Sequence, residues 1–378
     1  MPTVLVASDK FKGSLTAAQV ADAVGAGVRR ARPDARVRAV PVADGGDGTL
    51  AAVLDAGFTA VPVTASGPTG EPVDTRYARR GDVAVVELAA VSGLVRLPGG
   101  RLRPLCATSR GTGEVMAAAI AAGCREIVLG VGGSAGTDGG AGLVAALGAR
   151  LLDASGDDIG DGGVALPDVA SIDLTGLRAA TRGVAVTIAS DVDNPLTGPR
   201  GAAAVYGPQK GAGPAEVARL DAALAHWADV VARTTGRDLR DTPGAGAAGG
   251  VGFAGLALLG AALRPGIELV LDLAGFAGAL RGADLVVTGE GKLDEQTLHG
   301  KAPAGVARAA GRAGVPVVAV CGSTTLPPAR LHDTGIRAAY ALTDLEPDID
   351  VCLRDGARLL ETLGERIAAE HLEGGETE

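Results

Sequence analysis

The stretch DLVVTG at positions 284–289 decides the fold, because it repeats a pattern that opens the chain as TVLVAS at positions 3–8. Both are short β-branched runs bounded by glycine or polar residues, which predicts buried strands of a parallel sheet. Further strands are predicted at 37–43, 315–322 and 336–342, and helices at 14–31, 49–56, 303–312 and near the carboxyl terminus. The two ends of the chain therefore share one sheet, interrupted by a long intervening segment.

A five-stranded doubly wound sheet commonly has the strand order 2-1-3-4-5. This order places strand 3–8 beside strand 284–289, and the order reverses between these two strands. We therefore predict an α/β protein with a discontinuous domain of residues 1–63 and 282–378 and an inserted α/β domain of residues 64–281. The inserted domain has strands of its own, such as EIVLGVG at 126–132 and GVAVTIAS at 183–190.

The composition restricts the class of partner. A net charge of -9 and an aromatic content of 2% argue against nucleic acid, which requires a basic face and usually stacking side chains. The four cysteines are widely separated, so neither a zinc site nor a disulfide framework is indicated. A small molecule is the expected partner.

The expected location is the cytoplasm, since no basic residue precedes Lys10 and the first apolar run is too short for a signal peptide. Residues 242–263 contain no charge and are long enough to span a bilayer. Seven of these 22 residues are glycine, however, so the stretch is interpreted as a loop followed by a buried helix. No membrane association is predicted, and the sequence leaves the oligomeric state open.

The chain contains thirty arginines but only five lysines, and every lysine lies near glycines or acids. Ligands of doubly wound sheets bind beyond the carboxyl ends of the strands at the order reversal, where loop 9–14 would meet loop 289–297. Lys10, Lys12 and Lys292 would converge there, because a compact ammonium can approach phosphate where a planar guanidinium does not fit. Solvated surface lysines are the alternative.

Four further stretches combine glycine with acids or hydroxyls: ADGGDGT (43–49), TSRGTGE (108–114), GVGGSAGTDGGAG (130–142) and SDVDNPLTG (190–198). Such loops allow close backbone approach to anions and can hold magnesium or supply a general base. The inventory of carboxylates, lysines and glycine loops, without zinc ligands or a nucleophilic triad, suits phosphoryl transfer. Each loop alone also permits a structural turn, an Asx-Pro turn or a helix cap, and the alternative for Arg110 is an ion pair with Glu114.

The predicted site residues fall into four groups. The catalytic candidates are Asp191, as the first choice of general base, with Asp9 and Lys12; the substrate-binding candidates are Ser109, Arg110 and Asn194. The nucleotide-binding candidates are Gly132, Gly133, Ser134, Gly289, Gly291 and Lys292, and the metal-binding candidates are Asp47 and Asp294. His299, the histidine beside a candidate site, is interpreted as structural.

Eight motifs, taken in order, resemble the bacterial type 1 glycerate kinases over nearly the whole chain: SDKFKGSLTA, PVADGGDGT, TSRGTGE, GVGGSAGTDGGAG, SDVDNPLTG, GPQKGA, DTPGAGAAGGVG and TGEGKLDEQTLHGK. The resemblance implies a flavodoxin-like sheet with an inserted domain and ATP- and Mg²⁺-dependent phosphorylation of D-glycerate in the cleft between the two domains. Many members have serine in place of Lys10, which favours Lys12 as the essential lysine. Many also have glutamate in place of Asp47, and Thr-Asn in place of Gly136 and Thr137.

The same resemblance favours 2-phosphoglycerate over 3-phosphoglycerate as the product. The competing hypotheses are a kinase for another small hydroxy acid and a sensor that binds a phosphorylated metabolite without turnover. A pure sensor is disfavoured, because a site so rich in acids would repel an anionic ligand unless a metal or the chemistry required them.

Overall fold

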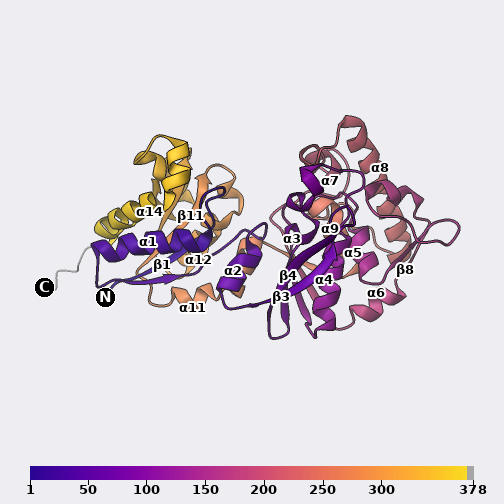
Figure 1. Ribbon diagram of the computed structural model, residues 1–378, viewed down its shortest axis with the longest axis horizontal. Coiled ribbons are helices and arrows are strands. Elements are labelled where there is room, and N and C mark those ends of the chain that lie inside the picture. The colour runs from indigo at the N-terminus through magenta and orange to yellow at the C-terminus, as the bar shows by residue number, and fades with distance from the viewer. Residues whose placement is uncertain (373–378) are drawn as a thin grey trace. The chain divides into compact units, whose positions relative to one another are not determined.

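The computed structural model describes residues 1–372, which form two compact units. The first unit comprises Met1–Asp44, Ala51–Gly57 and the chain from Ile267 onward, and the second comprises Gly45–Leu50 and Phe58–Gly266. Figure 1 shows both ends of the chain, indigo and yellow, in the first unit, while the middle of the chain builds the second.

A five-stranded parallel sheet forms the centre of the first unit, in the order β2-β1-β11-β12-β13. Its strands are β1 (Thr3–Ser8), β2 (Arg36–Ala39), β11 (Leu285–Leu293), β12 (Val317–Thr324) and β13 (Ile336–Ala341). The predicted neighbours β1 and β11 pair in register, with Val6 opposite Val287. All six residues of β1 are buried, as expected of a strand covered on both faces.

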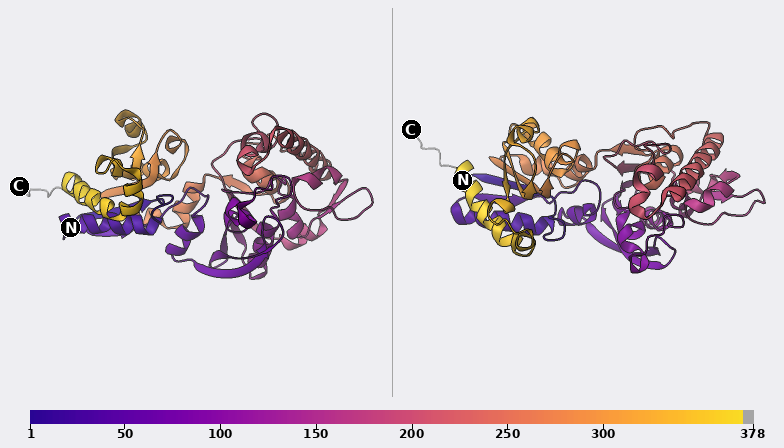
Figure 2. Two further views of the ribbon diagram at one scale, coloured as in Figure 1. Left: turned by 45° about the horizontal axis from the view of Figure 1, so that its top comes forward. Right: turned by 90° about the horizontal axis from the view of Figure 1, so that it is seen from above.

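Helices cover both faces of this sheet. The helices of the first unit are α1 (Ala17–Ala31), α2 (Thr49–Asp55), α10 (Gly266–Leu273), α11 (Phe276–Leu280), α12 (Ala302–Arg312), α13 (Pro328–Asp333) and α14 (Ile349–His371), of which α2 and α10 begin in residues of the second unit. Helices α1 and α14 pack side by side on one face, as Figures 1 and 2 show. Their backbones approach so closely that a Cβ on Gly27 would lie 1.9 Å from the carbonyl oxygen of Glu361.

Helix α1 begins later than predicted. Thr16, rather than Ser14, caps the helix, because its hydroxyl oxygen accepts a hydrogen bond from the backbone N–H of Gln19. The side-chain oxygen of Gln19 in turn accepts a hydrogen bond from the backbone N–H of Thr16, which completes a capping box. Ser14 instead donates to the carbonyl oxygen of Leu353 in α14. Residues 9–15 are thereby released from the helix and form a loop.

The second unit is built on a six-stranded sheet in the order β10-β9-β6-β5-β4-β3. Its strands are β3 (Thr59–Ser66), β4 (Pro72–Arg80), β5 (Val83–Glu87), β6 (Glu126–Gly130), β9 (Ala185–Ala189) and β10 (Ala262–Arg264). Strands β5, β6, β9 and β10 run parallel to one another. Strand β4 pairs antiparallel with both β3 and β5. The carboxyl ends of β5, β6, β9 and β10 therefore share one edge, here called the second carboxyl edge.

Helices and a small ribbon complete the second unit: α3 (Ala89–Ser92), α4 (Arg110–Ala121), α5 (Ala141–Ala146), α6 (Thr175–Ala180), α7 (Ala202–Tyr206), α8 (Pro214–Thr235) and α9 (Ala247–Leu258), with β7 (Arg150–Leu152) paired to β8 (Ser171–Asp173). Trp227 of α8 is fully buried in their core. Helix α9 (Ala247–Leu258) occupies the middle of the uncharged stretch 242–263 rather than its second half, and its first turn is interrupted by left-handed backbone at Ala248, Gly249 and Gly250. No helix within residues 1–372 is long and apolar enough to cross a bilayer.

The boundaries of the two units differ from the predicted domain limits at 63/64 and 281/282. Strand β3 pairs with β4 along its whole length, which places residues 59–63 in the second unit. Helices α10 and α11 bury Ile267, Val270 and Phe276 in the core of the first unit, although these residues precede position 282. An edge strand with an exposed face and two short helices carry no local signal of the sheet to which they belong.

Candidate functional site

The first unit brings two predicted loops together at the carboxyl edge of its sheet. The backbone N–H of Asp9 donates to the carbonyl oxygen of Gly289 at 2.9 Å. Phe11 is buried and closes a tight turn with Leu15, through mutual backbone hydrogen bonds of 2.8 and 3.0 Å. A Cβ on Gly291 would lie 3.4 Å from the backbone nitrogen of Lys12, so this turn rests on β11.

Asp9 has the chemistry of a poised acid or base. Burial and the negative charge of Asp44 raise its pKa from 3.8 to about 7, and Glu290 adds to the increase. The opposing contributions are a 2.6 Å hydrogen bond from the backbone N–H of Lys10 and the positive charge of that lysine. A carboxyl group with a pKa near neutrality can accept and return a proton efficiently at physiological pH.

Glu290 is a site residue that the sequence reasoning missed. Its side chain is 12% exposed, accepts a hydrogen bond from the hydroxyl of Thr297, and lies 3.4 Å from the ammonium of Lys301. Burial raises its pKa, against the lowering effects of Thr297 and Lys301. The predicted strand ends at Gly289, whereas β11 continues to Leu293 and so includes Glu290. The signal that could have identified Glu290 is an acidic residue within a strand of the buried sheet.

The end of β11 and the loop that follows it present the predicted Lys292 and Asp294. Lys292 is exposed, and its ammonium lies 3.9 Å from the carboxylate of Asp294. The other oxygen of Asp294 accepts from the backbone N–H of Gln296 at 3.0 Å, and Thr297 ties the loop back to Glu290. Lys12 is also exposed, and within residues 1–372 its ammonium makes no hydrogen bond or ion pair. Two lysines and a carboxylate are thus accessible to a ligand in the first unit.

At the second carboxyl edge, glycines let three loops pack backbone against backbone. A Cβ on Gly132 would lie 2.6 Å from the Cα of Gly46, and one on Gly45 would lie 2.7 Å from the Cα of Gly266. The loop of residues 45–50, which carries the exposed Asp47, therefore lies against the segment 130–142, called here the glycine loop. Close packing explains Gly132, which was predicted to approach a nucleotide, without reference to any ligand.

Asp138 is a second residue that was missed, and it organises the glycine loop. Its buried carboxylate accepts hydrogen bonds from the backbone N–H groups of Ser109, Gly140 and Gly142 and from the hydroxyls of Thr108 and Ser109. The hydroxyl of Ser109 also accepts a bond from the N–H of Leu143 at 3.0 Å. Ser109, a predicted substrate ligand, is thus 4% exposed and fully engaged within the protein.

Arg110 pairs with Asp161, and not with Glu114, which was its alternative partner. The Nε–H of Arg110 donates to both carboxylate oxygens of Asp161, at 2.8 and 3.0 Å, and this pairing raises the pKa of the guanidinium. Glu114 instead accepts from the backbone and hydroxyl of Ser66. Arg110 is the first residue of α4 and lines a pocket of about 360 Å³ together with Asp161. Its two terminal amino groups have no partner within residues 1–372.

The two candidates that follow β9 differ in exposure and in their hydrogen bonds. Asp191 is exposed, and one carboxylate oxygen accepts from the backbone N–H of Gly266 at 3.0 Å. Both ends of the Asn194 amide are engaged, because its nitrogen donates to the carbonyl of Arg200 at 2.8 Å and its oxygen accepts from the hydroxyl of Tyr206 at 2.6 Å. The bonding pattern of Asn194 matches the Asx-type turn that was the alternative interpretation.

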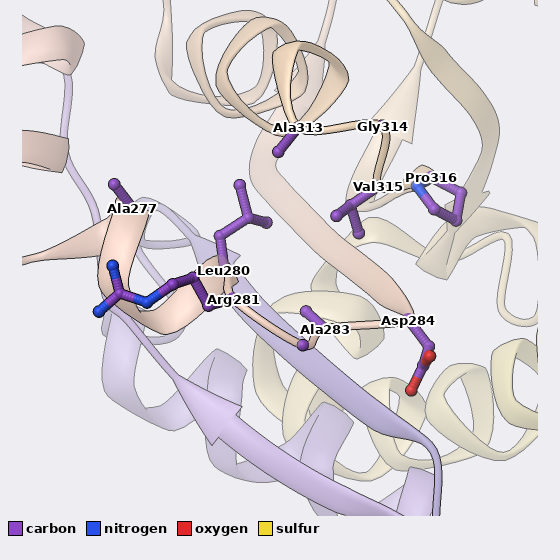
Figure 3. A pocket seen from close by; sticks show the side chains of 10 residues that line it. Ala277, Leu280, Arg281, Ala283, Asp284, Ala313, Gly314, Val315 and Pro316 are labelled. Atoms are coloured by element: carbon purple, nitrogen blue, oxygen red, sulfur yellow. The ribbon is translucent and has the colours of Figure 1, made fainter.

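A pocket of about 540 Å³ lies far from these groups in the first sheet. Figure 3 shows that its lining comes from the segments that precede β11 and β12, including Arg281, Asp284 and Pro316. It therefore opens at the amino ends of the strands, whereas Asp9, Gly291 and Lys292 belong to the carboxyl ends. Ligands of doubly wound sheets bind at the carboxyl ends, so this pocket is not the candidate site.

No group of three or more histidine, cysteine, aspartate or glutamate side chains within the described residues forms a metal cage. Magnesium does not require such a cage, since it is usually bound by one or two carboxylates together with substrate phosphates and water. The partly exposed Asp294 fits this mode of binding, because among the described side chains one of its oxygens is engaged only with a lysine 3.9 Å away. Asp47 lies in the second unit.

Two α/β units with lysines, carboxylates and glycine loops at the carboxyl edges of parallel strands suit the class of enzymes that transfer phosphoryl groups to small molecules. Comparison with known proteins identifies the family. The model of the glycerate kinase family matches residues 4–372, and the chain therefore belongs to that family of kinases.

Individual relatives agree over the full length. The chain is 44% identical to a glycerate kinase of Bacillus subtilis over 369 residues, covering 97% of each chain. It is 43% identical to a glycerate 2-kinase of Escherichia coli over 354 residues, covering 93% of each. A crystal structure from Salmonella typhimurium LT2, described as a glycerate kinase 2, superposes with a TM-score of 0.87 at 42% identity and complete coverage of both chains.

Proposed function

We propose that this protein transfers the terminal phosphoryl group of ATP to D-glycerate in a Mg²⁺-dependent reaction. The names of the relatives support glycerate as the acceptor. The order β2-β1-β11-β12-β13 supports assigning the first unit to the flavodoxin-like sheets. The location of the site in a cleft between the two domains stays a prediction from the resemblance.

The observation that carries the proposal is Asp9. Phosphoryl transfer to an alcohol requires an acceptor for the hydroxyl proton, and the raised pKa of Asp9 fits that task. We therefore assign the general base to Asp9 in preference to Asp191, which is exposed and bonded to a backbone N–H. Asp9 lies three positions before Lys12 in the chain, and the accessible ammonium of Lys12 attracts anionic oxygens.

We assign the nucleotide phosphates to the end of β11 and the loop that follows it. Lys292 and Lys12 supply positive charge, and Glu290 fixes the shape of the loop through Thr297 and Lys301. Gly291 keeps β11 in contact with the turn of residues 9–15, since a Cβ there would lie 3.4 Å from the backbone nitrogen of Lys12. Gly289 allows close packing of β11 on β12, since a Cβ there would lie 2.4 Å from the carbonyl oxygen of Val320. Asp294 would hold the Mg²⁺ that accompanies the phosphates, and the ion would neutralise the charge that develops on them.

We assign the carboxylate of glycerate to Arg110. Its two terminal amino groups form the fork that matches a carboxylate, while Asp161 holds the Nε–H. Among the predicted substrate ligands, Ser109 then orients the start of α4 rather than the substrate, through its bonds to Asp138 and Leu143. The name of the Escherichia coli relative favours the 2-hydroxyl as the acceptor.

The test is ADP release in a coupled assay with D-glycerate, L-glycerate, glycerol and tartronate, each with and without Mg²⁺. We expect turnover with D-glycerate alone among the four, and only when Mg²⁺ is present. Phosphorus NMR of the product distinguishes 2-phosphoglycerate from 3-phosphoglycerate. Faster turnover of tartronate would support a kinase for another hydroxy acid, and tight binding without turnover would support a sensor.

A further inference from the structure

The glycine loop resembles a phosphate-binding loop in its glycines, but it contains no lysine between residues 130 and 142. In the P-loop, a lysine within the loop supplies the positive charge. The structure places a lysine against the glycine loop from a distant part of the chain. The ammonium of Lys210 donates to the hydroxyl of Ser134 at 2.8 Å and to the carbonyl oxygen of Gly136, across sequence separations of 76 and 74 residues.

Lys210 is among the largest fully buried side chains and is 1% exposed. Within residues 1–372 no carboxylate lies within 4.0 Å of its ammonium, although the negative charge of Asp138 acts on it from farther away. A buried ammonium without a close counter-ion costs stability, and proteins rarely retain one that serves only packing. The turn of Pro208–Lys210 is itself fixed, since Gly211 has a φ of +93° and packs against Leu102.

The glycine loop is buried at Ser134 and exposed at Gly133. Gly133 has a φ of +70°, and its carbonyl oxygen accepts from the N–H of Leu94. Beyond Ser134, the carboxylate of Asp138 holds the far end of the loop. The loop is therefore fixed by a cation near one end and an anion near the other, and its exposed tip lies directly beside the residue that the cation binds.

We propose that Lys210 is a positioning residue that holds Ser134 and Gly136, so that the exposed tip at Gly133 binds an anionic oxygen of a substrate. This inference rests on the proposed kinase function. Lys210 supplies the positive charge that the glycine loop lacks in its own sequence. It is buried under the loop and acts through its hydrogen bonds to Ser134 and Gly136, without contacting the ligand. The anionic oxygen belongs either to the carboxylate of glycerate or to a phosphate of the nucleotide, which share the same chemistry.

The test compares Lys210→Met with Trp227→Phe in the full chain. Trp227 is also fully buried, and its indole N–H donates to the carbonyl oxygen of Gly139 in the same loop at 3.0 Å. Trp227→Phe removes a buried hydrogen bond from the loop but no charge, which makes it a matched control. Michaelis constants for D-glycerate and for ATP are measured separately, and they identify which substrate supplies the anionic oxygen.

We expect Lys210→Met to raise one of the two Michaelis constants about tenfold or more, with a smaller change in kcat. Trp227→Phe should leave both constants within about twofold of the wild-type values. Burial lowers the pKa of Lys210 to about 8, so the affected wild-type constant should increase as the pH rises through 8. Asp138 is the charged group that opposes this lowering. In Lys210→Met the increase should be absent.

Ser134→Ala keeps the proposal testable if Lys210→Met does not fold, since it removes only the hydroxyl that Lys210 binds. It should raise the same Michaelis constant. Calorimetric binding of ATP and of D-glycerate gives a readout that does not depend on turnover, and so separates failure of this inference from failure of the proposed function. Unchanged constants in both variants, or equal changes in Trp227→Phe, would overturn the proposal.

Discussion

Replacing Asp9 with asparagine should stabilise the first unit while removing most of the activity. Asparagine has nearly the same shape, and its side-chain oxygen can still accept the 2.6 Å hydrogen bond from the N–H of Lys10. It carries no charge, however, so the burial and the carboxylates that raise the pKa of Asp9 no longer impose a cost. Stability and turnover should therefore change in opposite directions.

The magnitude follows from the pKa. A carboxyl group whose pKa is 3.8 when unfolded and about 7 when folded binds its proton more tightly in the folded state. This tighter proton binding contributes fully to the free energy of unfolding below about pH 4. As the pH rises through 7 the contribution is lost, which lowers the free energy of unfolding by about 4 kcal/mol. Asp9→Asn should thus match the wild type near pH 4 and exceed it by up to about 4 kcal/mol at pH 8.

The assay must report on the first unit alone. The chain has one tryptophan, Trp227, and it lies in the second unit, so fluorescence would follow the wrong transition. Hydrogen exchange of peptides covering β1 and β11 reports local stability around Asp9. It is measured without metal or nucleotide, and the observed rates are corrected for the intrinsic exchange rate at each pH. Asp22→Asn is the matched control, because Asp22 is an exposed aspartate on α1 in the same unit.

Turnover by Asp9→Asn should fall by about 100- to 10,000-fold, as expected when a positioned general base is lost. The wild-type kcat should rise with pH up to about 7, as Asp9 ionises. Near-normal turnover would exclude Asp9 as the base, and Asp191→Asn would then be the next variant to measure. Equal exchange protection in the wild type and Asp9→Asn at pH 8 would refute the electrostatic reasoning itself.

Three further predictions concern substrate binding. Glu290→Gln keeps an acceptor for Thr297 but loses the ion pair with Lys301, so the Michaelis constant for ATP should increase several-fold while that for D-glycerate hardly changes. Lys292→Ala should also weaken ATP binding; an unchanged Michaelis constant together with unchanged turnover would remove Lys292 from the nucleotide site. Arg110→Lys should raise the D-glycerate constant at least about tenfold, since a lost fork contact is worth about 1.5–3 kcal/mol, and Asp161→Asn should produce a smaller increase of the same kind. Equal effects of Arg110→Lys on both substrates would instead identify a phosphate ligand.

The sequence was sufficient to predict the first sheet, because its central strands β1, β11 and β12 each contain a short buried apolar run bounded by glycine or polar residues. Strands β1 and β11 lie where TVLVAS and DLVVTG stand, and they are hydrogen-bonded neighbours. The assignment of residues 267–281 was beyond such reasoning. Helix α10 buries Ile267 and Val270 in the first unit, but its amphipathic pattern would serve equally well against either sheet.

The candidate site was predictable where one loop carries its own chemistry, as in the convergence of the loops after β1 and β11. It was not predictable where a residue acts through a distant contact. Asp138 lies in the sequence TDGG, which looks like a turn, yet its carboxylate binds groups as far away as Thr108 and Ser109. Glycines did not distinguish packing from ligand binding, since the close approach of Gly132 to the backbone of Gly46 by itself requires a glycine.

The retention of lysine can now be argued from its environment. Arginines of this chain form exposed ion pairs, such as that of Arg30 with Glu361, where a wide and flexible side chain is tolerated. Lys210 instead places its ammonium between the hydroxyl of Ser134 and the carbonyl of Gly136, in a space closed to solvent. A guanidinium is planar and presents five N–H donors in a fixed fork, so it could neither fit there nor satisfy its remaining donors. The space around the ammonium of Lys301 is similarly confined, because it lies beside the buried Glu290 at the start of α12. Where the protein needs a point charge inside a confined space, arginine is excluded by its shape, and lysine persists.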